Sequence, residues 1–296
     1  MDERAALSLV AGAVPTAGDD CAVVGDLVAT TDMLHETSDF PDGTTRYTAG
    51  WRSVGASLSD VAAMGAEATA ALAVYGAPSF DTSELEAFLD GCLDVCSAVG
   101  AEYVGGDLDG HAEFTVSTTA FGRADDPVFR SGATPGDAVC VTGAFGRSAA
   151  ALRRFGAGET ERANELFRFE PRVAAGRALR PHASAMMDSS DGLARSLHQL
   201  AEASDCGMSI AYDDVPVAPS VREVADSPDD ERELAVHFGE DFELVCAVPP
   251  GTVDRLDAAC PAGLTRVGTV TDPTHGVTVD DEDGTRPLPD RGYTHG

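Results

Sequence analysis

The stretch Ser57-Leu58-Ser59-Asp60-Val61-Ala62-Ala63-Met64-Gly65 does most to decide the fold. It closes a run rich in Ala, Ser, Val and Leu over residues 48–64, so we expect a helix that Gly65 terminates. Asp60 lies in the apolar part of this helix, and an ionised carboxylate buried there is costly unless it is paired or bound to a metal ion. An exposed helix face is the alternative interpretation, and the sequence leaves both open.

Working outward, short Asp-bearing clusters with Gly, Ser or Thr neighbours recur along the chain. Carboxylates supply the oxygen ligands that hard cations prefer, and small neighbours let backbone amides approach a phosphate. The clusters are Gly18-Asp19-Asp20, Thr30-Thr31-Asp32, Ser57-Leu58-Ser59-Asp60, Gly105-Gly106-Asp107, Asp188-Ser189-Ser190-Asp191-Gly192 and Gly239-Glu240-Asp241.

The cluster that begins at Asp188 follows the strand-like run 185–187 and precedes a helical pattern. Asp191 is well placed to cap a helix that starts at Gly192, which accounts for one carboxylate. It does not account for Asp188, three residues earlier at the end of an apolar strand. Two carboxylates that converge at a helix N-terminus suit a Mg²⁺ ion whose remaining ligands are phosphate oxygens.

Other clusters have ordinary interpretations that stay open. The Gly-rich clusters at residues 18–20 and 105–107 also fit tight turns. Arg130 stands in an Arg-Ser-Gly loop, where it is either a solvated linker residue or a contact for an ATP phosphate. Glu240 and Asp241 also fit the polar start of a strand.

Composition limits the classes of function. Of 296 residues, 50 are acidic and 20 are basic, every basic one is Arg, and the formal net charge is −30. An acidic surface without Lys is typical of adaptation to high salt and argues against binding to nucleic acids or anionic membranes. Without Lys, Walker-type and protein-kinase-type nucleotide sites are excluded as they are usually built.

No apolar run approaches the roughly 20 residues of a membrane span, and the acidic start does not resemble a signal peptide. We expect a cytoplasmic protein with reduced, mostly buried thiols. The cysteines are Cys21, Cys92, Cys96, Cys140, Cys206, Cys246 and Cys260.

Hydrophobic patterns predict an α/β (α+β) fold in two lobes. The expected strands are 27–34, 68–75, 114–121, 138–142, 185–187, 242–248 and 264–270. The expected helices are 48–64, 83–99, one that starts at Ser148 and one that follows Asp191. The helix 83–99 opens with Ser83 and Glu86 at the spacing of a capping box. The turn-rich segment 122–137 separates a domain 1–124 from a domain 125–296. We expect a loop over residues 213–232 and turns in the last 25 residues.

The order and spacing of these clusters resemble those of the thiamine-monophosphate kinase family. This family lies in the superfamily that also contains aminoimidazole ribonucleotide synthetase, a hydrogenase maturation protein and selenophosphate synthetase. The resemblance runs through residues 18–24, 30–34, 57–65, 105–107, 130–137, 141–143, 188–193, 239–244 and 292–293.

The resemblance implies a fold of the aminoimidazole ribonucleotide synthetase type, with an N-terminal α/β lobe that pairs across a homodimer. It implies phosphorylation of thiamine phosphate to thiamine diphosphate with ATP and several Mg²⁺ ions. The residues that match the metal-binding positions are Asp20, Thr30, Thr31, Asp32, Asp60, Asp107, Asp188 and Asp191. Those that match ATP contacts are Gly106, Arg130 and Ser190, and those that match substrate contacts are Asp39, Glu240 and Tyr293.

The chain departs from the family pattern at several positions. Asp39 stands where many relatives have His, Leu108-Asp109 replaces Thr-Thr, and Ala144-Phe145 changes a glycine loop. Two other kinds of function remain as alternatives. One is another ATP-using member of the superfamily, of the aminoimidazole ribonucleotide synthetase or hydrogenase maturation type; the other is a non-enzymatic protein that binds Mg²⁺ or nucleotide.

Overall fold

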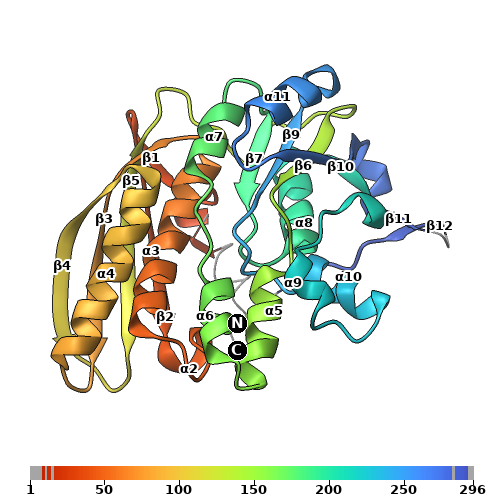
Figure 1. The fold of residues 1–296 in the computed structure, drawn as a ribbon. Helices are drawn as coiled ribbons and strands as arrows, with labels where there is room; N and C mark the ends of the chain where they lie inside the picture. The colour runs from red at the N-terminus through yellow and green to blue at the C-terminus, as the bar shows by residue number, and fades with distance from the viewer. Residues whose placement is uncertain (1–8, 11, 15–16, 282–283, 293–296) are drawn as a thin grey trace.

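Two β-sheets, each with its own helices, stand side by side in the computed structural model (Figure 1), which describes residues 9–10, 12–14, 17–281 and 284–292. The first sheet draws its strands from residues 22–123 and the second from residues 138–287. The α/β fold in two lobes that the sequence predicts is therefore confirmed.

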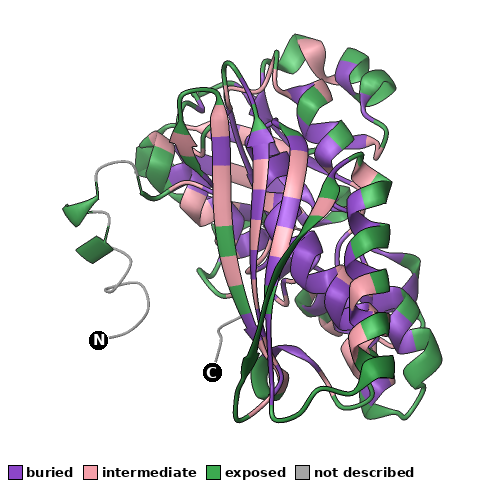
Figure 2. Ribbon diagram, turned by 90° about the vertical axis from the view of Figure 1, so that its left-hand side faces the viewer, coloured by how far each residue is buried: buried purple, intermediate pink, exposed green. Residues whose placement is uncertain are grey.

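The N-terminal sheet is covered by helices on one face. Its strands, in spatial order, are β1 (Ala22–Val24), β2 (Leu27–His35), β5 (Thr115–Arg123), β3 (Glu67–Ala77) and β4 (Glu102–Gly110). The helices of this lobe are α2 (Glu36–Asp39), α3 (Arg46–Ala63) and α4 (Thr82–Val99). Alternate residues of β5, from Val116 to Gly122, are buried on the helix side. The opposite face, seen in Figure 2, carries intermediate and exposed residues.

The C-terminal sheet is more deeply enclosed, and three of its strands, β6, β9 and the edge strand β7, are buried along their whole length. Its strands, in spatial order, are β12 (Gly284–Pro287), β11 (Val277–Asp281), β8 (Gly207–Ala211), β10 (Leu264–Thr271), β6 (Ala138–Thr142), β9 (Leu244–Val248) and β7 (Ala185–Asp188). Its helices are α5 (Arg147–Gly156), α6 (Thr160–Phe167), α7 (Val173–Leu179), α8 (Leu193–Ser204), α9 (Pro219–Arg222), α10 (Pro228–Val236) and α11 (Val253–Ala259). Short 3₁₀ turns are η1 (Tyr212–Asp214), η2 (Pro250–Thr252) and η3 (Pro273–His275).

Helix α3 connects the two lobes. It packs on β2, β3 and β5 of the N-terminal sheet and also contacts β7 and α7 of the C-terminal lobe. Fourteen of its 18 residues are buried, because Ala, Gly and Ser allow close packing on several sides. The helix ends as predicted, with Gly65 next to the C-cap in a left-handed conformation at φ +63°.

Four details of the predicted elements were wrong. Helix α4 is capped by Asp81, whose side chain accepts hydrogen bonds from the backbone N–H groups of Ser83 and Glu84, so the capping box predicted at Ser83 is not used. The cluster at residues 105–107 is not a turn but part of strand β4. The supposed loop 213–232 contains α9 and α10, and the last 25 residues contain β11 and β12. Both α9 and α10 start with Pro, which is tolerated in the first helical turn because its missing N–H has no partner there.

The cysteines behave as expected: all seven are buried and none forms a disulfide. None of the described helices combines the length and the apolar character that crossing a membrane requires.

Candidate active site

Three carboxylates from distant parts of the chain meet between the lobes. Asp20, Asp60 and Asp188 each offer an oxygen, and these oxygens all lie within 4.8 Å of one another. Asp20 precedes β1, Asp60 lies in the last turn of α3, and Asp188 ends β7. We call these three residues the carboxylate cluster. Their convergence requires both lobes, since Asp188 comes from the C-terminal sheet.

Hydroxyl groups orient the carboxylates around the cluster. The Thr30 hydroxyl donates to Asp60 Oδ2 over 2.6 Å, and the Ser57 hydroxyl donates to Asp32 Oδ2 over 2.6 Å. Side chains alternate along a strand, so Thr30 and Asp32 share the face of β2 that α3 covers. Thr31 faces the other way, and its hydroxyl donates to the Thr118 carbonyl over 2.8 Å. The structure therefore brings Thr30 and Asp32 to the cluster but not the side chain of Thr31.

The cluster is electrostatically unfavourable without a cation. Burial, followed by the charges of Asp32, Asp188 and Asp20, raises the pKa of Asp60 well above its ordinary value. Burial and the neighbouring Asp20 raise the pKa of Asp188 to about 8. Within the described part of the chain, the buried Oδ2 of Asp20 accepts no hydrogen bond. A site with crowded oxygen ligands and an unsatisfied buried carboxylate oxygen fits a hard divalent cation.

Arg130 contacts the cluster from the segment between the lobes. Its Nη2 and Nε donate to Asp20 Oδ1 over 2.6 and 3.2 Å, and its backbone N–H donates to the Asp19 carboxylate. A hollow of about 370 Å³ opens beside it, with Cys21, Val23 and Phe129 among its lining residues. An apolar wall next to a guanidinium and several carboxylates is suited to a ligand with an aromatic part and a charged part.

Two loops of the C-terminal lobe touch directly behind the cluster. The N–H groups of Glu240 and Phe242 donate to the carbonyls of Ser190 and Ser189 over 2.5 and 3.0 Å. Gly239 has φ +91°, and a Cβ there would lie 2.7 Å from the Ser190 carbonyl oxygen. These contacts bring Ser190 and Glu240 together, two residues that the sequence assigned to different ligands.

The position of Asp191 differs from the capping role that the sequence offered as an ordinary explanation. The helix α8 starts at Leu193, and its N-cap is Gly192, which has no side chain to cap with. The interpretation of Asp191 as the N-cap residue is therefore wrong, because the chain needs Gly at that position, where φ is +106°.

Other predicted residues lie apart from the carboxylate cluster. Gly106 lies three strands from Asp32 across the N-terminal sheet, about 14 Å at the usual strand spacing. The path runs from Asp32 to its partner Thr118, then to Ala73 and then to Gly106. The adjacent Asp107 is exposed on this edge strand, β4. Asp39 is buried in α2 and accepts hydrogen bonds from the His35 N–H and the Ser38 hydroxyl. Tyr293 lies outside the described residues.

Sequence reasoning missed Arg52, a buried arginine of α3 that contacts Glu240, and the hydroxyl of Ser57 that orients Asp32. The signal for Arg52 was available, since it is a charged residue among the small and apolar residues of the helix that also carries Asp60.

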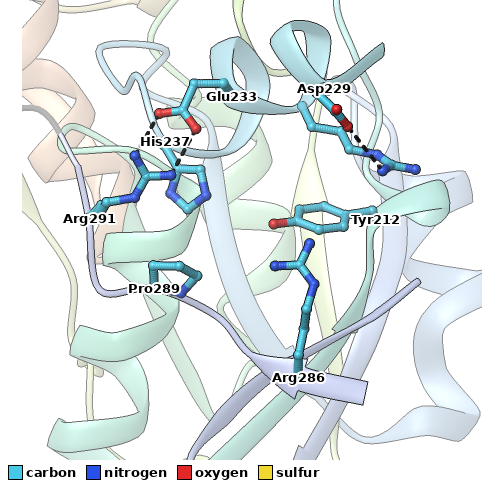
Figure 3. Close-up of a pocket in the computed structure, with 8 residues that line it drawn as sticks. Tyr212, Asp229, Glu233, His237, Arg286, Pro289 and Arg291 are labelled. Carbon is cyan, nitrogen blue, oxygen red and sulfur yellow. Dashed lines mark hydrogen bonds and ion pairs between the residues drawn. The ribbon is translucent and has the colours of Figure 1, made fainter. Parts of the chain in front are cut away.

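A second hollow lies at the C-terminal segment (Figure 3) and is lined by Tyr212, Asp229, Arg232, Glu233, His237, Arg286, Pro289 and Arg291. Its three arginines are all engaged with carboxylates. Arg291 pairs with Glu233 over 2.8 Å, Arg286 with Asp281 over 2.9 Å, and Arg232 with Asp229 over 3.8 Å. The Arg291 pair anchors the C-terminal segment to α10. The next residue, Gly292, packs so closely on the Asp191 carbonyl that a Cβ would lie 2.2 Å from it. The C-terminal segment therefore reaches the loop that carries Asp191.

Comparison with known proteins decides the family. The N-terminal domain model of AIR synthase related proteins matches residues 18–124, and the C-terminal domain model matches residues 134–281. The thiamine-monophosphate kinase of Halobacterium salinarum (strain ATCC 700922 / JCM 11081 / NRC-1) is 65% identical over the full length of both chains.

The chain belongs to the thiamine-monophosphate kinase family.

Two further members of this family extend the comparison. The thiamine-monophosphate kinase of Methanospirillum hungatei JF-1 is 39% identical, and the match covers 100% of this chain and 99% of the relative. A solved structure, AaThiL complexed with AMPPCP and TMP, superimposes with a TM-score of 0.90 at 26% identity, covering 99% of this chain and 97% of that one. This chain and that solved structure therefore share the two-lobed fold over nearly their whole length.

Proposed function

We propose that this chain is a thiamine-phosphate kinase that transfers the γ-phosphoryl group of ATP to thiamine phosphate, giving ADP and thiamine diphosphate. The observation that carries the proposal is the carboxylate cluster, assembled from both lobes in a chain of this family. The similar solved structure, which is complexed with AMPPCP, an analogue of ATP, and TMP, supports binding of both ligands by a protein of this fold.

The chemistry of the reaction suits a site of this composition. The acceptor phosphate of thiamine phosphate is already anionic near neutral pH, so its attack needs no strong general base. The main obstacle is repulsion between two anionic groups. This is consistent with a cluster of carboxylates that includes no His, Cys or Lys ligand.

Magnesium is the cation we propose for the cluster. Asp20, Asp60 and Asp188 would hold it, and the unsatisfied Oδ2 of Asp20 supports this. Further proposed ligands are Thr30, Asp32 and Asp191. Thr31 and Asp107, which the family resemblance also suggested, do not join them at the cluster, because the Thr31 side chain faces the other way and Asp107 lies on the exposed edge strand β4. Bound Mg²⁺ ions would neutralise phosphate charge and align the reacting oxygens.

On the donor side, we assign ATP to the hollow beside Arg130. The walls formed by Cys21, Val23 and Phe129 suit a nucleobase, and the Arg130 guanidinium suits its phosphates. The ion pair with Asp20 fixes the orientation of the planar guanidinium group of Arg130. Ser190 is a further proposed ATP contact, whereas Gly106, which the family resemblance also suggested, lies on strand β4 and does not line this hollow.

On the acceptor side, we assign thiamine phosphate to Glu240, Asp39 and Tyr293. Thiamine phosphate carries a cationic ring, which a carboxylate stabilises. Glu240 supports this role because 16% of its side chain stays exposed although the loop around it is tightly bonded.

We further propose a cytoplasmic, salt-adapted homodimer. The uncovered face of the N-terminal sheet supports a partner copy, since Met33 and Val74 are 60% and 37% exposed there and flank polar residues such as Thr31. Sedimentation of the wild type and of Met33→Arg at micromolar concentration tests this. We expect a dimer for the wild type and monomers for the variant. A monomeric wild type would contradict the dimer.

Product analysis tests the activity. The purified chain in molar KCl with Mg²⁺ and ATP should form ADP and thiamine diphosphate in equal amounts from thiamine phosphate, and chelation of Mg²⁺ should abolish the reaction.

ATP turnover with the acceptor of the aminoimidazole ribonucleotide synthetase reaction, but not with thiamine phosphate, would favour that alternative. If calorimetry detects binding of Mg²⁺ but no binding of MgATP, the non-enzymatic alternative is favoured. Unchanged turnover in Asp191→Asn would remove that residue from the metal site.

A further inference from the structure

Arg52 is a fully buried cation at the contact between the lobes. It lies on α3, its side chain is 1% exposed, and its charged group forms an ion pair with Glu240 Oε2. Its Nη1 donates to the Phe167 carbonyl over 2.8 Å, and its Nη2 donates to the Glu240 carbonyl over 3.2 Å. The guanidinium also lies over the Phe167 ring, 3.7 Å from the centroid. All of these partners belong to the C-terminal lobe.

Glu240 has a backbone conformation that needs external support. Its φ is +63°, in the left-handed region of the backbone that residues other than Gly rarely adopt, and Phe242 has φ +55°. The Glu240 carbonyl accepts hydrogen bonds from both the Ser148 hydroxyl and Arg52. Its N–H donates to the Ser190 carbonyl. Arg52 is thus the one partner that holds both the backbone and the carboxylate of Glu240 among the contacts given for the described residues.

The next residue in the chain fixes the same loop from the other side. The buried Asp241 carboxylate accepts hydrogen bonds from the N–H groups of Gly146 and Ser148 at the start of α5. The loop backbone is therefore tied to α5 and to the loop after Asp188, while the direction of the Glu240 carboxylate is set by Arg52.

We propose that Arg52 is a positioning residue: it orients Glu240 to bind thiamine phosphate and links this contact to the helix that carries Asp60. The inference rests on the proposed function. Arg52 itself does not touch the reacting atoms. A buried arginine that only joined the lobes would affect stability alone, so substrate-specific kinetics separates the two roles.

The conservative variant Arg52→Lys is the first test. Lysine keeps the charge but has no planar fork, so it cannot serve Phe167, the Glu240 carbonyl and the Glu240 carboxylate together. We expect the KM for thiamine phosphate to rise by about tenfold, while the KM for ATP stays within about twofold of the wild type. A lower unfolding midpoint with both KM values unchanged would overturn the proposal.

Arg46→Lys is the matched control. Arg46 lies on the same helix, pairs with Glu36 over 2.9 Å and lies over the Phe114 ring at 3.9 Å, but all these contacts stay within the N-terminal lobe. We expect both KM values to stay at the wild-type level. An equal rise in the KM for thiamine phosphate in Arg46→Lys would mean that any disturbance of α3 has this effect, and would overturn the specific role of Arg52.

A double-mutant cycle with Glu240→Gln tests whether Arg52 acts through Glu240. If it does, the double variant should have the same KM for thiamine phosphate as Glu240→Gln alone, within about twofold. Multiplication of the two single effects would contradict this route. Should Arg52→Lys fail to fold, Ser148→Ala removes the other side-chain donor to the Glu240 carbonyl, and it should raise the KM for thiamine phosphate but not for ATP. An unchanged KM for thiamine phosphate in Ser148→Ala would then count against the proposal.

The wild type distinguishes failure of this inference from failure of the proposed function. A wild-type enzyme that forms no thiamine diphosphate contradicts the function itself. An active wild type with kinetically silent Arg52 and Ser148 variants contradicts only the positioning role.

Discussion

At Asp60, burial and three neighbouring carboxylates all oppose the loss of one proton. Replacement by Asn keeps the shape but removes the charge and one metal ligand. We expect Asp60→Asn to lower kcat/KM by on the order of 100-fold or more. The metal-free variant should unfold at a higher temperature than the metal-free wild type, because Asn avoids the free-energy cost of either ionising this buried carboxyl group or keeping it protonated above its ordinary pKa. Calorimetry in the presence of a chelator measures this, and a lower midpoint would contradict the repulsion.

The raised pKa of Asp188, about 8, predicts how stability depends on pH in the absence of Mg²⁺. Between about pH 4 and pH 8 the folded protein binds a proton at Asp188 that the unfolded chain does not bind. The free energy of unfolding should therefore fall as the pH rises through this window. Mg²⁺ competes with the proton, so it should stabilise the protein more at pH 8 than at pH 6.

Thermal unfolding at both pH values, with chelator or with Mg²⁺ and at one salt concentration, checks this prediction. Asp188→Asn is the control, since its stability should respond much less to pH and to Mg²⁺. An equal Mg²⁺ effect at the two pH values would contradict the competition.

Single residues show where sequence reasoning reached its limit. Once β2 is predicted, the alternation of side chains separates Thr31 from Thr30 and Asp32, so this separation could have been anticipated. The partner of Arg52 could not, because Glu240 is distant in the sequence and reaches it only through the packing of the two lobes.

The start of α4 offers a prediction on the scale of an element. Asp81 accepts hydrogen bonds from two N–H groups of the first turn, whereas the sequence pointed to Ser83. We expect Asp81→Ala to lower the free energy of unfolding by about 1 kcal/mol. Ser83→Ala should cost less, and neither variant should alter the KM values. Denaturant unfolding compares the two, and a greater loss in Ser83→Ala would restore the capping box.

The contact between the loops that carry Ser190 and Glu240 offers a second prediction at this scale. A Cβ at Gly239 would meet the backbone of residues 190–192, and φ there is +91°. We expect Gly239→Ala to lower the free energy of unfolding by about 2–4 kcal/mol and to reduce activity, because the loops of Ser190 and Glu240 must separate. Gly251→Ala is the control, since nothing lies within 4 Å of a Cβ at that position. Equal stability of the two variants would contradict the close contact.

Elements with strong hydrophobic patterns were predicted well, and those with mixed signals were not. The bounds of β6 match the predicted strand because all five residues are apolar or Thr and all are buried. Helices α9 and α10 were missed because Pro and Asp, common in loops, are also favourable in a first helical turn. Strand β4 was missed as a continuous element because Gly105 and Gly106 resemble a turn, although a Cβ at Gly106 would lie 1.6 Å from the Ala73 carbonyl oxygen in the pairing with β3.

For the whole molecule, the net charge of −30 makes salt a main determinant of stability. The Debye length falls from about 10 Å at 0.1 M to about 3 Å at 1 M, which weakens repulsion between surface carboxylates. We expect the unfolding midpoint to rise on transfer from 0.1 M to 2 M KCl. A neutral osmolyte at equal osmolality is the control and should have a smaller effect. A midpoint independent of KCl would contradict adaptation to salt.

The convergence of Asp20, Asp60 and Asp188 is a property of the whole chain. Local patterns placed Asp60 in a helix and Asp188 at a strand end, but they carry no information on the distance between lobes. Family resemblance supplied the expectation of a common site, and the packing of α3 against β7 explains how Asp60 and Asp188 come within reach.

Helix α3 has one further consequence, which concerns insertions and deletions. Arg52 and Asp60 are separated by eight residues of continuous helix, about 12 Å along the axis. One added residue between them would rotate one side chain by about 100° relative to the other. A substitution in this interval acts at one position, as at Ser57, whose hydroxyl orients Asp32, whereas any change in its length would misalign the two ends of the site. The number of residues between Arg52 and Asp60 therefore sets the distance between the proposed contact for thiamine phosphate at Glu240 and the carboxylate cluster.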